Sequence, residues 1–267
     1  MIWELYAIRY ATRDARRRDN FIGGDPHEAS MPLDYYVWLA RSGERAVVID
    51  MGFTPEVAKK RKRDYLRTPA QGLALLGVDA ARVEDVIVTH LHYDHVGTYE
   101  AFPGARFHLQ DDEMAYATGR YMRFARFNHG YEIDDVVGMV RLTYGDRVRF
   151  HSGTGEVAPG ITVHRIGGHT RGLQCVRVAT RRGLVVVASD ASHFYEHMQQ
   201  NRCFPTVFNV GEMIDGYEIL RRLADSEDHI VPGHDPLVMR RFPAAGPALE
   251  GIAVRLDVEP SRAGQGE

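Results

Sequence analysis

The chain has 267 residues, of which 44% are hydrophobic and 26% charged, as expected for one large α/β domain of a soluble globular protein. Its 33 basic and 36 acidic residues leave a net charge of -3, which argues against nucleic acid as the main partner. No apolar stretch approaches the ~20 residues needed to cross a bilayer, and the N-terminus lacks the features of a secretion signal. Together with two cysteines that show no CxxC spacing, this predicts a cytoplasmic protein with no membrane partner.

Predicted strands and helices follow one another along the whole chain. Residues 3–10, 35–40 and 45–49 are rich in β-branched and aromatic side chains, which predicts strands. Thr54-Pro55-Glu56 is a helix start, with an N-cap residue before a first-turn proline, and we expect this helix to continue to about Leu66. Further on, the patterns predict strands at 83–88, 105–109, 161–166, 173–180, 184–188 and 229–231, and helices at 111–127 and 212–223.

Candidate site residues stand where these strands end. Four strands end at or run into Asp50, His90, Asp190 and His234, and a fifth ends just before His169. In α/β sheets, ligands collect outside the strand ends because the loops converge there. The polar residues are therefore expected to meet at one edge of the sheet.

The segment His90-Leu91-His92-Tyr93-Asp94-His95 places three histidines and a carboxylate within six residues. Imidazole and carboxylate are natural ligands of zinc and similar divalent ions. At these offsets, one ion could take His90 and His92, and a neighbouring ion Asp94 and His95. The alternative is a surface loop that is rich in histidine by chance, since the chain has 13 histidines. The position directly after an apolar strand favours metal binding.

His169, Asp190 and His234 complete two sites of plausible valence. Each follows an apolar strand and lies close to a glycine or another small residue, where backbone can approach closely. Taken alone, a histidine after a glycine pair is more often a turn residue. Together, three histidines and a shared carboxylate would bind one ion, and Asp94, His95, His234 and the same carboxylate the other. Two dications facing two carboxylates would lower the pKa of a bridging water towards neutrality.

This pattern resembles the metallo-β-lactamase fold superfamily over roughly residues 35–240. The signature HxHxDH stands at 90–95, and the later landmarks follow in order, as Gly168-His169-Thr170, Ser189-Asp190 and Gly233-His234-Asp235. The run from Val47 to Gly52 matches the early Asp-x-Gly strand end. The resemblance implies an α/β fold, an αββα sandwich of two mixed sheets flanked by helices. We expect one domain over 1–258 and a flexible tail over 259–267.

Within the superfamily, the chain most resembles the N-acyl homoserine lactonase group. The support is its length, its single-domain layout, His-Leu-His-Tyr-Asp-His-Val-Gly and Ser189-Asp190-Ala191-Ser192. The resemblance implies two zinc ions, with Fe, Mn or Co as other candidates, bridged by Asp190. Asp94 would be both ligand and proton shuttle. Asp50 would orient the metal loop through hydrogen bonds, although a plain turn carboxylate is an equal alternative.

The function implied by this resemblance is opening of a lactone, including N-acyl homoserine lactone in quorum quenching, by attack of a metal-bridging hydroxide. One position departs from the group: the tyrosine usually found three residues after the bridging aspartate is His193 here. His193 could donate the same hydrogen bond to the substrate carbonyl, or could face outward without a role. The expected partner is then a small-molecule lactone or ester. The sequence is also compatible with a homodimer.

Two other functions compete with lactone opening. A glyoxalase II-like thioesterase shares the histidine loop, but the stretch after His234 is short and rich in proline, whereas that enzyme needs a helical region for its thiol carrier. A non-catalytic metal-binding or ligand-sensing protein is disfavoured by Asp94 and the seven candidate ligands. Aromatic and methionine side chains over 111–131 are either core packing or an apolar wall for an acyl chain.

Overall fold

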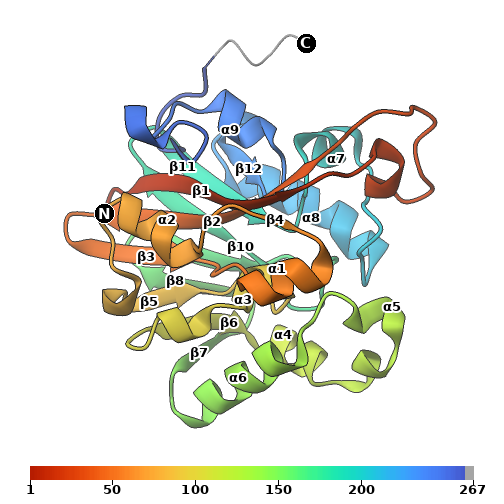
Figure 1. Ribbon diagram of the computed structural model, residues 1–267, viewed down its shortest axis with the longest axis horizontal. Helices are drawn as coiled ribbons and strands as arrows, with labels where there is room; N and C mark the ends of the chain where they lie inside the picture. The colour runs from red at the N-terminus through yellow and green to blue at the C-terminus, as the bar shows by residue number, and fades with distance from the viewer. Residues whose placement is uncertain (262–267) are drawn as a thin grey trace.

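Alternating apolar side chains on the strands build two sheets that pack face to face, in a computed structural model that describes residues 1–261 (Figure 1). The first sheet has the order β13-β1-β2-β3-β5-β6-β7, with β4 paired to β1. Pairing is antiparallel from β13 to β3 and parallel from β3 to β7, so the sheet is mixed. Its strands are β1 (Glu4–Arg13), β2 (Leu33–Ser42), β3 (Arg45–Ile49), β4 (Asp64–Tyr65), β5 (Asp85–Ile87), β6 (Arg106–Gln110), β7 (Val148–His151) and β13 (Ala253–Arg255).

The second sheet has the order β12-β11-β10-β9-β8. Only β11 and β12 pair in parallel, so this sheet is mixed too. Its strands are β8 (Thr154–Ala158), β9 (Ile161–Arg165), β10 (Gln174–Thr180), β11 (Gly183–Ser189) and β12 (Ile230–Pro232). The hairpin expected between β10 and β11 is present, since Thr180 pairs with Gly183.

The core has two layers because successive strand residues point to opposite faces. Leu5 and Trp38 of the first sheet pack with Val176 of the second. Ile8 and Val48 face the other way and join the helices α1 (Pro55–Arg61), α2 (Pro69–Leu75) and α6 (Ile133–Tyr144) in a separate core. Helix α8 (Val210–Leu223) belongs to the core that contains the second sheet. The αββα sandwich predicted from the sequence is therefore confirmed.

The helix that begins at Thr54 is shorter than predicted. Thr54 does cap it, accepting a hydrogen bond from the Val57 amide. The helix ends at Arg61 because Lys62 adopts a left-handed φ of 55°. The chain then extends, and Asp64–Tyr65 pairs with β1 instead of continuing the helix to Leu66.

The single helix predicted over 111–127 is wrong. The segment forms α4 (Asp111–Ala117), a 3-10 turn (Arg120–Arg123) and α5 (Ala125–Asn128). Its aromatic side chains do not form one helix face but converge on Phe208, with ring centroids 4.8 Å away for Tyr116 and 5.2 Å for Tyr121. Packing on a distant segment overrides the local helical spacing here.

Five further helices within residues 1–261 were missed by the sequence analysis, although Thr68-Pro69-Ala70-Gln71 is the capping-box start of α2. Besides α2 and α6, these are α3 (Tyr93–Val96), α7 (Tyr195–Gln200) and α9 (Leu237–Arg241). No helix within residues 1–261 is long and apolar enough to cross a membrane. Of the tail predicted over 259–267, residues 262–267 lie outside the described residues. The single-domain boundary at 258 stays a prediction.

Asp135 on α6 makes the stability of the fold depend on pH. Burial, together with the charges of Glu132 and Asp134, raises its pKa from 3.8 to about 7. A raised carboxyl pKa means that folding disfavours the ionised form, so stability is lost as the pH rises from the unfolded pKa to the folded one. The advantage of Asp135→Asn over wild type in urea unfolding should grow by about 1–2 kcal/mol between about pH 5 and about pH 8, after allowance for solvent screening.

The matched control for this prediction is Asp146→Asn, at a carboxylate whose side chain is 88% exposed. It should show the pH dependence of the wild type. Parallel wild-type and Asp135→Asn stability curves over the same pH range would contradict the role of Asp135.

Candidate metal centre

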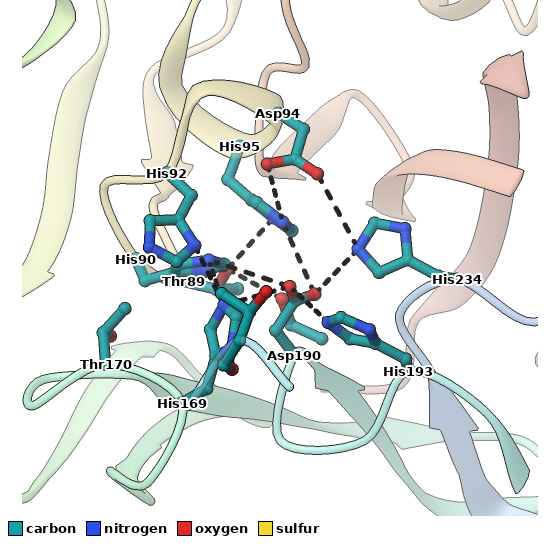
Figure 2. A network of polar contacts seen from close by, with 12 residues as sticks. Thr89, His90, His92, Asp94, His95, His169, Thr170, Asp190, His193 and His234 are labelled. Atoms are coloured by element: carbon teal, nitrogen blue, oxygen red, sulfur yellow. Dashed lines mark hydrogen bonds and ion pairs between the residues drawn. The ribbon is translucent and has the colours of Figure 1, made fainter. Parts of the chain in front are cut away.

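The ends of four strands bring the candidate residues to one place. Asp50 follows β3, His90 follows β5 after a short extension, Asp190 follows β11 and His234 follows β12. Asp50 and Ser189 adopt positive φ angles of 60° and 47°, which turn the chain sharply as it leaves the sheet. Figure 2 shows the side chains of the histidine loop, His169, Asp190 and His234 directed toward a common centre.

His90, His92 and His169 form the first group of possible ligands. The Nε2 atom of His169 lies 3.2 Å from His90 Nε2 and 2.9 Å from His92 Nδ1. Its Nδ1 atom donates to the Thr206 carbonyl at 2.6 Å, which leaves Nε2 directed at the other two rings. Burial lowers the pKa of each of these histidines, so their rings are neutral and offer lone pairs to a cation.

Asp94, His95 and His234 form the second group. The Asp94 carboxylate lies 3.8 Å from the Nε2 atoms of both His95 and His234. The Nδ1 atoms of both rings are occupied elsewhere: His95 donates to Asp50 at 2.7 Å and His234 to the Asp34 carbonyl at 2.9 Å. These bonds turn both Nε2 atoms toward the centre, as outer partners do for metal-binding histidines.

Asp190 lies between the two groups. Its Oδ2 atom is 3.3 Å from His169 Nε2, and its Oδ1 atom is 3.0 Å from His234 Nε2 and 3.4 Å from His95 Nε2. Among residues 1–261, Asp190 Oδ1 and His95 Nε2 are buried and form no hydrogen bond. Buried polar atoms need a partner. One carboxylate facing two nitrogen clusters fits a pair of divalent ions.

Asp50 is fully buried and connects β3 to the histidine loop. It accepts hydrogen bonds from the Thr89 amide at 2.7 Å and the Thr89 hydroxyl at 2.8 Å, besides the one from His95. The sequence left open whether this residue orients the loop or serves as a turn carboxylate. These contacts favour orientation of His95.

Glu113 is a positioning residue that the sequence analysis missed. This buried carboxylate accepts hydrogen bonds from the amides of Leu91 and Gly172, both at 3.0 Å, and from the hydroxyls of Thr170 and Tyr131. It thus ties the His90 loop to the His169 loop. Asp111-Asp112-Glu113 resembles an ordinary acidic helix start. The available signal was helical spacing, which places Glu113 on the buried face of α4 with Tyr116 and Ala117.

His193 lies beside Asp190 rather than facing outward. Its Nε2 atom is 3.0 Å from Asp190 Oδ2, and its ring stacks on Phe204 with centroids 3.6 Å apart. Burial lowers its pKa well below the usual value, so the ring is neutral. In this arrangement Nε2 donates to Asp190, and the remaining Nδ1 atom accepts rather than donates.

The centre opens into a cavity of about 210 Å³, whose lining includes His92, Asp94, Asp190, His193 and His234. Gly130 also lines it, and a Cβ atom there would lie 2.6 Å from the His92 ring. A side chain at this position would therefore displace a candidate ligand.

The His/Asp groups at the strand ends of two helix-flanked sheets form a candidate dinuclear metal site. A family model described as the metallo-beta-lactamase superfamily matches residues 31–234, and the chain belongs to this superfamily.

Its relatives include N-acyl homoserine lactonases. AiiB of Agrobacterium fabrum is 28% identical over 180 residues, which are 61% of this chain and 64% of the relative. The matched part thus spans just under two thirds of that relative. The N-acyl homoserine lactonase of Bacillus cereus is 25% identical over 220 residues, covering 76% of this chain and 82% of the relative.

Solved structures show the same fold. A quorum-quenching N-acyl homoserine lactone lactonase superimposes with a TM-score of 0.73 at 20% identity, covering 89% of this chain and 94% of that chain. The hydrolase AbOPH of the beta lactamase superfamily gives a TM-score of 0.68 at 16% identity, covering 87% of each chain.

Proposed function

We propose that this protein is a dinuclear metal hydrolase that opens a lactone ring. The observation that carries the proposal is the position of Asp190, whose two oxygens face two separate ligand groups at the base of a cavity. The naming of the relatives as N-acyl homoserine lactonases supports the reaction class. The free, buried thiols of Cys175 and Cys203 agree with a cytoplasmic setting.

The proposed ligands divide between two ions that share Asp190. The first ion would take the nitrogens of His90, His92 and His169, and the second would take His95, His234 and the Asp94 carboxylate. Zinc suits a set of imidazoles and carboxylates, and Fe, Mn or Co can use the same donors. When bound, such ions supply an activated water and polarise the substrate carbonyl.

The protein's own residues would orient the reaction and move its proton. Hydrolysis adds one water, breaks the bond between the carbonyl carbon and the ring oxygen, and yields a hydroxy acid. Asp94 lines the cavity beside His234, where its carboxylate can pass a proton to the leaving ring oxygen. His193 would hold Asp190 in place through its Nε2 atom. That contact favours a positioning role over donation to the substrate carbonyl.

Metal removal tests the proposal directly. Protein treated with a chelator should lose hydrolysis of N-acyl homoserine lactones and simple lactones, and Zn²⁺ should restore it. A thioester assayed in parallel separates lactone opening from the thioesterase alternative. Full activity after complete metal removal would overturn the metal mechanism. A protein that binds two ions and hydrolyses neither ester nor thioester would be a metal-binding protein without turnover.

A further inference from the structure

Three arginines line the cavity that holds the metal centre: Arg13, Arg61 and Arg63. Arg61 forms an ion pair with Glu132 at 2.8 Å, a carboxylate that also contacts Lys60. Within residues 1–261, by contrast, Arg13 and Arg63 form no ion pair with any carboxylate at direct contact distance. Arg13 and Arg63 therefore place positive charge on the wall of the cavity, which Asp94 also lines, without a direct ion pair among the described residues.

Arg63 belongs to a chain of donors that leads into the cavity. Its Nε atom donates to the Tyr93 hydroxyl at 3.1 Å, and Tyr93 donates to the Tyr35 hydroxyl at 3.3 Å. Tyr35 lines the cavity, and its ring packs edge-on against His234, with centroids 5.2 Å apart. Because Tyr35 accepts the bond from Tyr93, its own hydroxyl proton remains free to be donated. Such a series of bonds strengthens the last donor.

Arg13 lines the same cavity as Tyr35. It stands at the end of β1, paired with Leu33 of β2, and Leu33 also lines the cavity. The Arg13 Nε atom is buried and has no hydrogen-bond partner among the described residues. A guanidinium matches the two oxygens of a carboxylate, and a buried N–H without a partner calls for an acceptor.

We propose that the substrate carries a carboxylate, which binds to Arg13, Arg63 and Tyr35 while its lactone group lies at the metal centre. This inference rests on the proposed function and narrows its substrate class. The cavity volume of about 210 Å³ lies below the ~300–1,000 Å³ of typical ligand pockets and favours a compact acid. The Asp94 carboxylate forms no direct ion pair with Arg13 or Arg63 and lies 3.8 Å from the Nε2 atoms of His95 and His234.

A matched pair of lactones tests this proposal on the zinc-loaded protein. One is γ-butyrolactone with a carboxylate on its γ carbon, and the other is γ-valerolactone, which has a methyl group there. We expect kcat/KM to favour the carboxylate by about 10–100-fold, mainly through KM, because charge-assisted hydrogen bonds contribute to binding. The preference should fall as salt is added.

Variants then identify the residues that cause the preference for the carboxylate. Arg13→Met and Arg63→Met should each reduce it by about tenfold or more, and Tyr35→Phe, which removes only a hydroxyl, should reduce it without loss of folding. Arg149→Met removes the same charge from β7, outside the cavity lining, and should keep the wild-type preference. Equal kcat/KM values for the two lactones, or a preference that survives all three cavity variants, would overturn the proposal while leaving lactone opening intact.

A binding measurement tests carboxylate recognition even if the protein does not open lactones. If neither lactone is hydrolysed, lactone opening is wrong, and calorimetric titration decides the inference. The zinc-loaded protein should bind 2-hydroxyglutarate about tenfold or more tightly than 4-hydroxypentanoate, which lacks the second carboxylate. Equal affinities, or a difference that Arg13→Met leaves unchanged, would show that the cavity does not recognise an anion.

Discussion

Asp190→Asn should lower the bound metal from two equivalents to one or none and reduce kcat/KM by ~10³-fold or more. Each carboxylate oxygen of Asp190 faces a different ligand group, and the amide of asparagine offers neither the charge nor the second anionic oxygen. The loss should appear first in elemental analysis of the purified protein and then in the lactone assay.

The control for Asp190 is Asp85→Asn. Asp85 is equally buried, at 2% exposure against 3% for Asp190, but pairs with His108 and with arginines on neighbouring strands. This variant should retain two metal ions even if it is less stable. An Asp190→Asn protein with full metal content and near wild-type kcat/KM would show that Asp190 is not a ligand of the metal centre.

Asp94→Asn should lower kcat for lactones by ~10²–10⁴-fold, because the leaving ring oxygen then lacks its proton donor. Metal content must be measured alongside, since Asp94 is also a proposed ligand. Whether the leaving oxygen needs a proton distinguishes the role of Asp94 in proton transfer from its role as a metal ligand. A nitrophenyl ester releases a stable phenolate that needs no proton, so its hydrolysis should suffer about 10–100-fold less than lactone opening.

An equal loss on the lactone and the nitrophenyl ester would assign Asp94 to metal binding alone. Near wild-type turnover of the lactone by a variant that has full metal content would exclude it from proton transfer. Zn²⁺ titration of the variant distinguishes weak metal binding from a defect in the chemical step.

The side chains that meet at the candidate centre could be predicted because their signals are local. The six residues from His90 to His95 lie on one short segment that runs from a loop into α3, and Asp190 and His234 each follow an apolar strand closely. A strand end restricts where the next side chain can lie, so the residues expected at the strand ends do come together here. The prediction of one helix over 111–127 was wrong for the opposite reason, since Tyr116 and Tyr121 pack on Phe208, about ninety residues away.

The sequence by itself identified the fold family through the resemblance of its motifs. Hydrophobic periodicity and ligand spacing, which act between near neighbours, predicted the residue types able to hold metal and most of the strands, but not β4, β7, β8 and β13. Only the tertiary structure decided that Glu113 joins two loops and that Arg13, Arg63 and Tyr35 share one cavity. Those contacts depend on which strands become neighbours at a sheet edge. Local spacing carries no information about that choice.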